Sequence, residues 1–392
     1  MKNHASSPGF VLLLSALIAL PALGTDMFAP AVPQLTEALG APVSAGQFTL
    51  TAFFVGIAAG QIAWGPLSDR FGRKPVLLAG LGIMLLSSAA AAAATSVQAV
   101  SAARVAQGLG MSSGSLIGRT IVRDLYAHEE AARLLSRMTI VFSLVPLCAP
   151  VLGALLVESL AWPSVFVAMA AVALVLILLL RTLGETAPAA RRSIRPGAIV
   201  RTFAAILADA RFRAPFFLIL CSHIGILAWV SSSSFALVRG LGVSTLAYGF
   251  MFGAVMLGQI VGAWAASRLV MRLGIGRLLR LGTALMLAAG AAAAALAWAG
   301  VAHWLAVVLP FTLFLFGTAI VFPNAMAAAL TPFPGAAGSA ASLIGAIGFA
   351  AGAVVSTALA GLFDGSARPL ATVALLAGLG AFVFERLLRG SR

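Results

Sequence analysis

Long apolar runs constrain the fold of this chain more than any other feature of its sequence. Each run is about 20 residues long, which is the length of helix that crosses the hydrocarbon core of a bilayer. Twelve runs lie near residues 10–30, 43–65, 75–95, 98–121, 138–158, 162–182, 214–237, 245–270, 277–299, 302–323, 338–361 and 369–388. They lack the polar and apolar alternation of barrel strands, so each run predicts a membrane-spanning helix.

The composition excludes several other classes of protein. The sequence is 61% hydrophobic and 9% charged, whereas a soluble domain carries about 25% charged residues. The net charge of +14 does not indicate nucleic-acid binding, because the basic residues flank the apolar runs. The expected surroundings are a lipid bilayer. Cys148 and Cys221 lie inside apolar runs without metal spacing and are expected to be free, buried side chains.

The distribution of Lys and Arg predicts the orientation in the membrane. With the N-terminus in the cytoplasm, 22 of the 25 Lys and Arg residues fall on the cytoplasmic side. Arg239 and Arg368 fall on the other side, and Arg104 lies inside a run. Cytoplasmic loops of membrane proteins carry such an excess of basic residues. Both termini are therefore predicted to be cytoplasmic.

The longest polar segment separates six runs from six. It predicts an N-terminal six-helix bundle over residues 1–183, a basic cytoplasmic linker over 184–213 and a C-terminal six-helix bundle over 214–392. Transporters are often built from two such halves, with the substrate site between them.

Two charged side chains, Asp26 and Arg104, fall well inside the apolar runs. Each costs about 2.5–3.5 kcal/mol to place at the centre of a membrane helix. At 1.5 Å of rise per residue, both lie about 6–9 Å below the outer boundary, so they can share one cavity. The functional interpretation is that Asp26 carries a proton and that Arg104 tunes how tightly it is held. The alternatives are a static buried salt bridge or an Asp26 that reaches outer water.

A charged stretch over residues 65–75 separates the second run from the third. It is predicted to be a tight, water-facing loop. Its pattern, G-x-L-x-D-R-x-G-R-K from Gly65 to Lys74, resembles the signature loop between the second and third helices of the major facilitator superfamily.

Other motifs in the N-terminal half resemble the same superfamily. The stretch from Arg104 to Gly110 resembles the R-x-x-Q-G-x-G motif in the fourth helix of its drug exporters. Residues 25–33 resemble the T-D-M-Y-x-P-A-x-P sequence of its Bcr/CflA subfamily, with Phe28 in place of the tyrosine. Residues 122–133 resemble the loop after the fourth helix in that subfamily.

The resemblance implies an all-α integral membrane fold of twelve transmembrane helices in two six-helix bundles. It implies a monomeric, multi-pass protein of the bacterial inner membrane that works by alternating access. The implied function is proton-coupled export of small, moderately apolar compounds, of the bicyclomycin- or chloramphenicol-resistance type. The alternative is a proton-coupled transporter of a metabolite such as an amino acid or a sugar.

The sequence has no G-x-x-x-x-G-K-[ST] motif for nucleotides, so the proton gradient is the expected energy source and no cofactor is expected. Its histidines are scattered, which predicts neither a metal site nor an enzyme.

The resemblance also implies roles for individual residues. Those implied in proton coupling and the substrate cavity are Asp26, Arg104 and Gln107. Those implied in a conformational switch loop are Gly65, Asp69, Arg70, Gly72, Arg73 and Lys74, together with Asp124. In this superfamily the acid equivalent to Asp69 meets the start of the eleventh helix in the outward-facing state, and the arginine equivalent to Arg73 pairs with the acid matched by Asp124. The alternative is that these charges only anchor the topology.

The fifth run carries a predicted hinge at Pro146, Pro150 and Gly153. It resembles the antiporter motif G-x-x-x-G-P-x-x-G-G, in which three of the four glycines are replaced here. The prolines predict a kinked helix. The remaining candidates for lining a cavity are Gln47, His223, Ser231 and Ser234, for which the alternative is a hydrogen bond to backbone or water.

Overall fold

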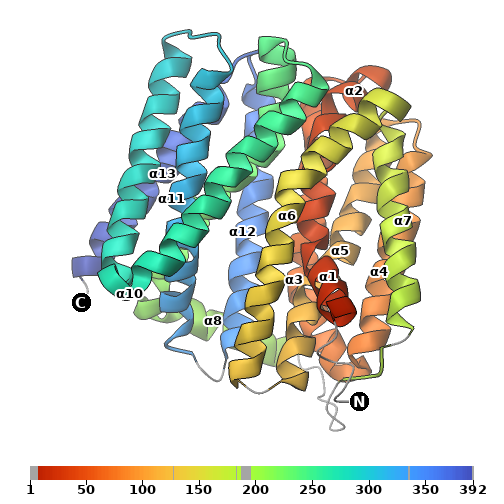
Figure 1. Cartoon of the computed structure of the whole chain (residues 1–392), viewed down its shortest axis with the longest axis vertical. Coiled ribbons are helices and arrows are strands. Elements are labelled where there is room, and N and C mark those ends of the chain that lie inside the picture. The colour runs from red at the N-terminus through yellow and green to blue at the C-terminus, as the bar shows by residue number, and fades with distance from the viewer. Residues whose placement is uncertain (1–7, 127, 182, 187–195, 334–335, 391–392) are drawn as a thin grey trace. The chain divides into compact units, whose positions relative to one another are not determined.

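The computed structural model of the protein describes residues 8–126, 128–181, 183–186, 196–333 and 336–390, and its regular structure is helical throughout those ranges (Figure 1). The chain divides into two compact units, Met1–Arg195 and Pro196–Arg392. The first unit contains α1 (Pro8–Asp26), the 3₁₀-helix η1 (Ala29–Ala31), α2 (Val32–Ala38), α3 (Val43–Phe71), α4 (Arg73–Ala92), α5 (Val97–Leu125), α6 (His128–Leu160) and α7 (Pro163–Leu180). The second contains α8 (Pro196–Ala208), α9 (Ala210–Ser234), the π-helix η2 (Phe235–Gly240), α10 (Thr245–Trp298), α11 (Leu305–Leu330), α12 (Ala337–Leu362) and α13 (Arg368–Gly390).

The twelve predicted spans are all found in these helices. Ten helices of the described ranges are long and apolar enough to cross a membrane. Among them α10 counts once but covers two predicted runs, because two helices meet at Gly274, whose backbone angles are φ 74° and ψ 160°. Helix α5 is not among the ten, because its buried face carries Arg104, Gln107 and several serines. With α5 and both arms of α10, the fold has twelve spans.

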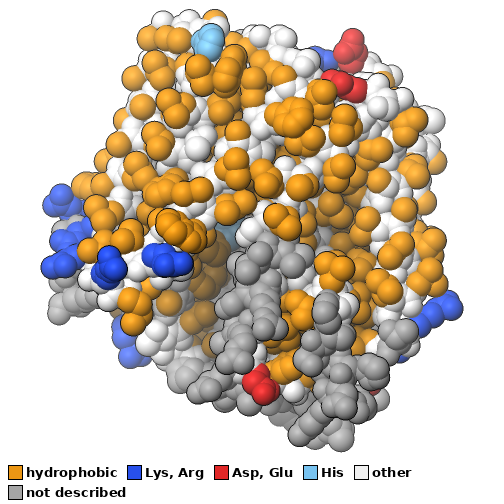
Figure 2. Space-filling view, viewed as in Figure 1, with side chains coloured by type: hydrophobic (Ala, Val, Ile, Leu, Met, Phe, Trp, Pro, Cys, Tyr) orange, Lys and Arg blue, Asp and Glu red, His pale blue; other side chains and the backbone are white. Residues whose placement is uncertain are grey.

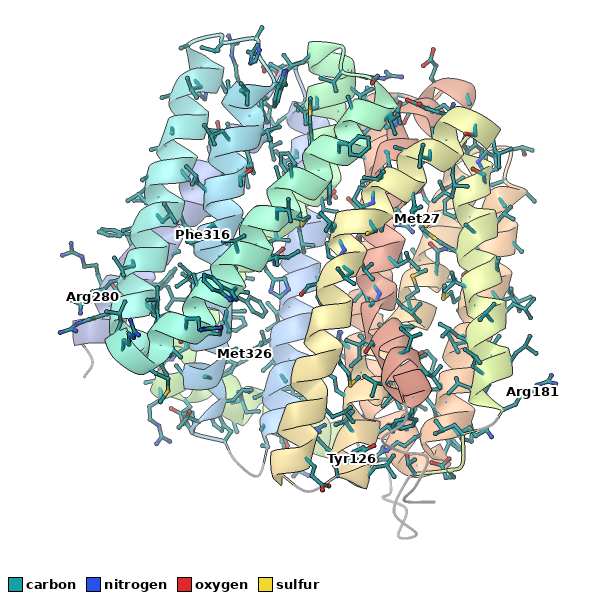
Figure 3. The ribbon with its side chains drawn as sticks, in the orientation of Figure 1. Met27, Tyr126, Arg181, Arg280, Phe316 and Met326 are labelled. Atoms are coloured by element: carbon teal, nitrogen blue, oxygen red, sulfur yellow. The ribbon has the colours of Figure 1, made fainter. Side chains whose placement is uncertain are left out.

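The bend of α10 lies among basic side chains. Arg side chains gather where its two arms meet, while hydrophobic side chains cover the arms themselves (Figure 2). Arg280 points away from the helices at this bend (Figure 3). Arg272 and Arg277 flank Gly274 and are exposed. This distribution matches the one that the sequence predicts for a loop facing the cytoplasm.

The prediction of a loop over residues 65–75 is wrong. Helix α3 continues through the charged residues to Phe71, and α4 begins at Arg73. Only Gly72 lies outside the two helices, with φ 102° and ψ 162°. Charged residues can lie at the end of a helix in water as readily as in a loop. One glycine at positive φ is enough to reverse the chain.

The predicted linker over residues 184–213 is also more structured than expected. It contains the whole of α8 and the first residues of α9, while residues 187–195 lie outside the described ranges. Asp209 caps α9 by accepting a hydrogen bond from the backbone N–H of Arg211. Helix α8 packs against α9 and α12 with Ile206 buried and Val200 exposed. It is therefore part of the second unit.

Helices α3 and α5 pack closely at glycines. At Gly108 an added Cβ would overlap the backbone of α3 at Phe53, and at Gly56 it would overlap the backbone of α5 at Val105. Small residues let membrane helices approach at backbone distance. This approach brings Arg104 of α5 within reach of Phe53 of α3.

Candidate functional site

Arg104 is a fully buried cation held between two aromatic rings. Its guanidinium carbon lies 3.9 Å from the ring centre of Phe53 and 4.4 Å from that of Phe28. Nη1 donates a hydrogen bond to Oε1 of Gln107, whereas Nε and Nη2 have no partner among the described residues. A desolvated cation–π contact contributes about 2 kcal/mol or more, which offsets part of the cost of burying the charge.

Gln107 connects Arg104 to the next helix. The R-x-x-Q spacing places both side chains on one face of α5, one turn apart. The amide of Gln107 donates from Nε2 to Oγ of Ser88 on α4 at 2.7 Å, and the same nitrogen lies 3.4 Å from Sδ of Met169 on α7. Three helices of the first unit therefore meet at this polar chain.

Asp26 is the last residue of α1 and is 4% exposed. Its Oδ1 accepts a hydrogen bond from the hydroxyl of Thr25 at 2.8 Å, and the same hydroxyl lies 2.9 Å from the carbonyl oxygen of Ala22. Within the described ranges no ion pair joins Asp26 to Arg104. The static salt bridge considered from the sequence is therefore not present in this structure. Phe28, two residues after Asp26, brings the end of α1 onto Arg104.

A second charged cluster forms around Arg73, which is 6% exposed. Its Nη1 donates to Oδ1 of Asp69 at 2.5 Å and to Oγ of Ser68 at 2.8 Å. Its Nε donates to Oδ2 of Asp124 at 3.0 Å. The end of α3, the start of α4 and the end of α5 are thus joined by one guanidinium, through the pair of residues that the sequence suggested.

Glu185, which the sequence analysis did not single out, caps the start of α4. Its carboxylate accepts hydrogen bonds from the backbone N–H of Arg73 at 2.9 Å and of Lys74 at 3.2 Å. In return, Nζ of Lys74 donates to the carbonyl oxygens of Arg181 at 3.0 Å and Leu183 at 2.6 Å, just past the end of α7. We call this pair of contacts the α4–α7 latch. A lone acid at the edge of a basic segment was the sequence signal that could have indicated it.

Two other residues of the predicted switch loop, Arg70 and Gly65, are not in these clusters. The guanidinium of Arg70 lies 5.2 Å from the ring of Phe71 and is exposed. A Cβ added at Gly65 would have only the side chain of Leu116 nearby, at 4.0 Å. Gly72, in contrast, lies against the Glu185 carboxylate, where an added Cβ would come within 2.5 Å of Oε2.

Comparison with known proteins identifies the family. A model of the Major Facilitator Superfamily matches residues 14–357. The chain belongs to the major facilitator superfamily.

Several of its relatives within the superfamily are named for drug resistance. The bicyclomycin resistance protein homolog of Haemophilus influenzae is 30% identical over 373 residues, which cover 94% of this chain and 93% of that protein. Multidrug resistance protein D of Escherichia coli is 28% identical over 86% of this chain and 84% of its own length. With the T-D-M motif at Asp26, these relatives place the chain in the Bcr/CflA subfamily. The crystal structure of a D-xylose-proton symporter has the same fold, with a TM-score of 0.74 at 16% identity, covering 96% of this chain and 98% of that one.

The hinge residues predicted for this superfamily member lie on α6. Pro146 and Pro150 are both inside the helix. Gly153 packs against the backbone of Met27, the residue after Asp26, so closely that a Cβ would overlap it. Figure 3 shows Met27 between the ribbons of the first unit, beside α6. The part of α6 that carries the predicted hinge residues therefore touches the segment that holds Asp26.

Of the remaining candidate residues of this superfamily member, Gln47, Ser231 and Ser234 are buried and His223 is partly buried. Gln47 is 1% exposed, and neither atom of its amide has a partner in the described part of the chain. Ser231 donates to the carbonyl oxygen of Ala228 at 3.3 Å, whereas Oγ of Ser234 is unpartnered there. His223 lies between aromatic rings. Within the first unit the structure thus brings together Arg104 and Gln107, with Asp26 nearby through Phe28, and Gln47 is not hydrogen-bonded to them.

The second unit has a buried acid that the sequence analysis did not count. Glu385 of α13 is 2% exposed and lies within a spanning helix. Asp26 is therefore not the only buried acid in a span. The two cysteines are free, with Cys221 buried and Cys148 exposed, so the expected burial of Cys148 is wrong.

Proposed function

We propose that this protein exports small, moderately apolar compounds from the bacterial cytoplasm in exchange for protons. The observation that carries the proposal is the relationship over nearly the whole chain to a bicyclomycin resistance protein homolog. The relationship to a multidrug resistance protein over 86% of the chain supports the same substrate class rather than an amino acid or a sugar.

Asp26 is the proposed proton carrier. The Thr25 hydroxyl can form a hydrogen bond with the carboxyl group of Asp26 in both its ionised and its protonated form. A hydroxyl has one proton to donate and lone pairs to accept. When Asp26 is ionised, that proton goes to Oδ1, at 2.8 Å. When Asp26 is protonated, its own O–H can donate to Thr25, whose proton then turns to the carbonyl of Ala22, at 2.9 Å. Either state leaves the buried carboxyl hydrogen-bonded, so proton uptake and release require little rearrangement.

Arg104 is the proposed link between the proton site and the transported compound. Two of its donor nitrogens are buried without a partner in the described residues. Buried donors of this kind gain most from an acceptor that enters their site. An oxygen of the compound would supply one, and the rings of Phe28 and Phe53 would hold the guanidinium in place meanwhile.

The Arg73 cluster is the proposed conformational switch. Asp69 keeps 39% of its side chain exposed while it pairs with Arg73, so it has room to change partners. A carboxylate at a helix N-terminus gains about 0.3–1 kcal/mol from the helix dipole. We propose that in the outward-facing state Asp69 meets the start of α12, which opens at Ala337.

The proposed setting follows from the charge distribution and the relatives. The protein is a monomer of the bacterial inner membrane with both termini in the cytoplasm, in agreement with the excess of Lys and Arg on one side of its spans. The proton gradient drives transport without a cofactor, and the protein is a carrier rather than an enzyme.

The test uses inside-out membrane vesicles with an acidified lumen and a pH-sensitive dye. Bicyclomycin, chloramphenicol, other antibiotics, amino acids and sugars are added in turn to vesicles with the wild type or Asp26→Asn. We expect antibiotics to release protons from the lumen with the wild type only. Equal responses from the two proteins would remove Asp26 from the coupling mechanism. Responses to amino acids or sugars alone would replace drug export with metabolite transport.

A further inference from the structure

Helices α9 and α12 of the second unit pack through small residues in a regular register. Gly348 of α12 lies against His223 of α9, and one turn further on Gly352 lies against Leu227, at positions where an added Cβ would meet those side chains. Small residues spaced four apart form one face of a helix and let a neighbour come close. The missing side chain at Gly348 makes the space that the imidazole occupies.

Aromatic rings from two helices enclose His223. The ring centre of Phe322, on α11, lies 5.1 Å from that of the imidazole at an interplanar angle of 72°. The ring of Phe349, on α12, lies 5.7 Å away at 60°. Both are edge-to-face contacts of the kind that aromatic pairs favour. The result is a three-ring cluster built from α9, α11 and α12.

The imidazole of His223 has no hydrogen bond within the described part of the second unit. Its Nδ1 is buried and unpartnered, although the side chain as a whole is only partly buried. A buried polar atom without a partner destabilises a protein, and a phenylalanine at the same place would not have this cost. Aromatic neighbours supply no acceptor or donor in compensation. A hydrogen-bonding group from outside the chain would satisfy the ring.

We propose that His223, Phe322 and Phe349 form a binding site for an aromatic compound that carries a hydroxyl, carbonyl or amide group. The rings pack against the aromatic part of the compound, and His223 makes one hydrogen bond to its polar group. This inference rests on the proposed function, because it assigns a substrate contact to the second unit and narrows the class of compounds carried.

The test measures equilibrium binding of radiolabelled chloramphenicol and other aromatic antibiotics to the full-length protein in lipid nanodiscs. His223→Phe keeps an aromatic ring but removes the hydrogen bond, and we expect it to bind about ten-fold more weakly, the effect of one lost hydrogen bond. His223→Asn keeps a hydrogen-bonding group, and we expect it to recover most of that affinity. The matched control is His303→Phe, since His303 is exposed and stacks on Trp304.

Thermal unfolding separates a binding role from a structural one. We expect His223→Phe to unfold at a higher temperature than the wild type, because it removes an unpaired buried nitrogen. Unchanged binding by His223→Phe, or no binding of any aromatic compound by the wild type, would overturn the proposal. The proposed function fails separately: a wild type that binds these compounds but moves no protons keeps the site and loses the antiport.

Discussion

At the scale of single residues, the two predicted intramembrane charges, Asp26 and Arg104, have different surroundings. Asp26 has a hydroxyl beside it, so its carboxyl group is hydrogen-bonded whether or not it holds a proton. Arg104 has two aromatic rings and one amide, and no carboxylate within the described ranges is paired with it. Lipid supplies no hydrogen bonds, so each arrangement has to be built from the chain itself. The first suits a group that changes charge, and the second suits a group that keeps it.

The contacts of Arg104 predict that lysine cannot replace it. A planar guanidinium stacks on rings and donates in several directions, whereas an ammonium is a compact point charge. We expect Arg104→Lys to reduce chloramphenicol efflux from cells at least ten-fold, measured as initial rate at equal expression. Arg123→Lys is the control, because Arg123 lies on the same helix and is exposed. Retention of more than half the wild-type rate by Arg104→Lys would contradict the proposed role.

If Asp26 is the single proton carrier, one proton should be exchanged for each compound, even though a second buried acid, Glu385, is present. Asp26 is the proposed carrier, and Glu385 lies in the other unit on α13. We expect Asp26→Asn to abolish proton release from acidified vesicles and Glu385→Gln to leave it intact. Coupling is measured as the dependence of compound accumulation on the imposed pH gradient. A slope of two protons per compound, or loss of coupling in Glu385→Gln, would show that a second acid takes part.

At the scale of helices, the charged ends of α3, α4, α5 and α7 in the first unit are joined by a few side-chain contacts. Arg73 joins α3, α4 and α5, and the α4–α7 latch joins α7 to the same point. Glu185 and Lys74 each satisfy groups that every helix leaves unpaired at its end. The latch therefore holds the segment after α7 against the start of α4.

Gly72 predicts a local loss of stability on substitution. Its φ of 102° is unfavourable for any other residue, and a Cβ would come within 2.5 Å of Glu185. We expect Gly72→Ala to destabilise the protein by at least about 1 kcal/mol, seen as a lower unfolding temperature in detergent. Gly65→Ala is the matched control in the same charged stretch. It lies inside α3 in open space, and alanine favours a helix, so its unfolding temperature should stay equal or rise.

The Glu185 cap of the α4–α7 latch predicts a second effect on stability. Removing a side chain that caps a helix N-terminus costs about 0.5–2 kcal/mol. We expect Glu185→Ala to lower the unfolding temperature and Glu37→Ala, at an exposed site on α2, to leave it unchanged. Equal unfolding temperatures for the two variants would mean that the cap contributes nothing to stability.

At the scale of the whole molecule, the chain consists of two compact units. Each has six spans and its own buried core, and the family model extends across both. Alternating access in such transporters is a motion of one half against the other around a shared site. The proposed contacts lie in both units, with the proposed proton site at Asp26 in the first unit and the His223 cluster in the second.

The charge distribution predicts the topology of the whole molecule. We expect a fluorescent protein fused after Arg392 to fluoresce and alkaline phosphatase fused there to be inactive, because the C-terminus is predicted to be cytoplasmic. A phosphatase fused after Arg239 should be active, because that residue lies on the far side in the prediction. The opposite result at either point would reverse the orientation and, with it, the proposed direction of transport.

The sequence alone was enough to predict the membrane spans, the family and the buried charges Asp26 and Arg104, whereas the orientation in the membrane stays a prediction. Hydropathy and charge are properties of short stretches, and a bilayer selects for them directly, so they can be recognised without knowing which helices touch. The sequence also suggested the partner of Arg73, because the family resemblance implies that the loop arginine pairs with the acid matched by Asp124.

Only the tertiary structure decided what surrounds those residues. Arg104 could have paired with Asp26, but the close approach of α3 and α5 at Gly108 places rings on the guanidinium instead. The cap of Glu185 on α4 joins residues more than 100 positions apart, and the aromatic cluster of His223 joins three helices. Such contacts depend on the angle and register at which helices pack, and these are set by many side chains at once rather than by any one stretch of sequence.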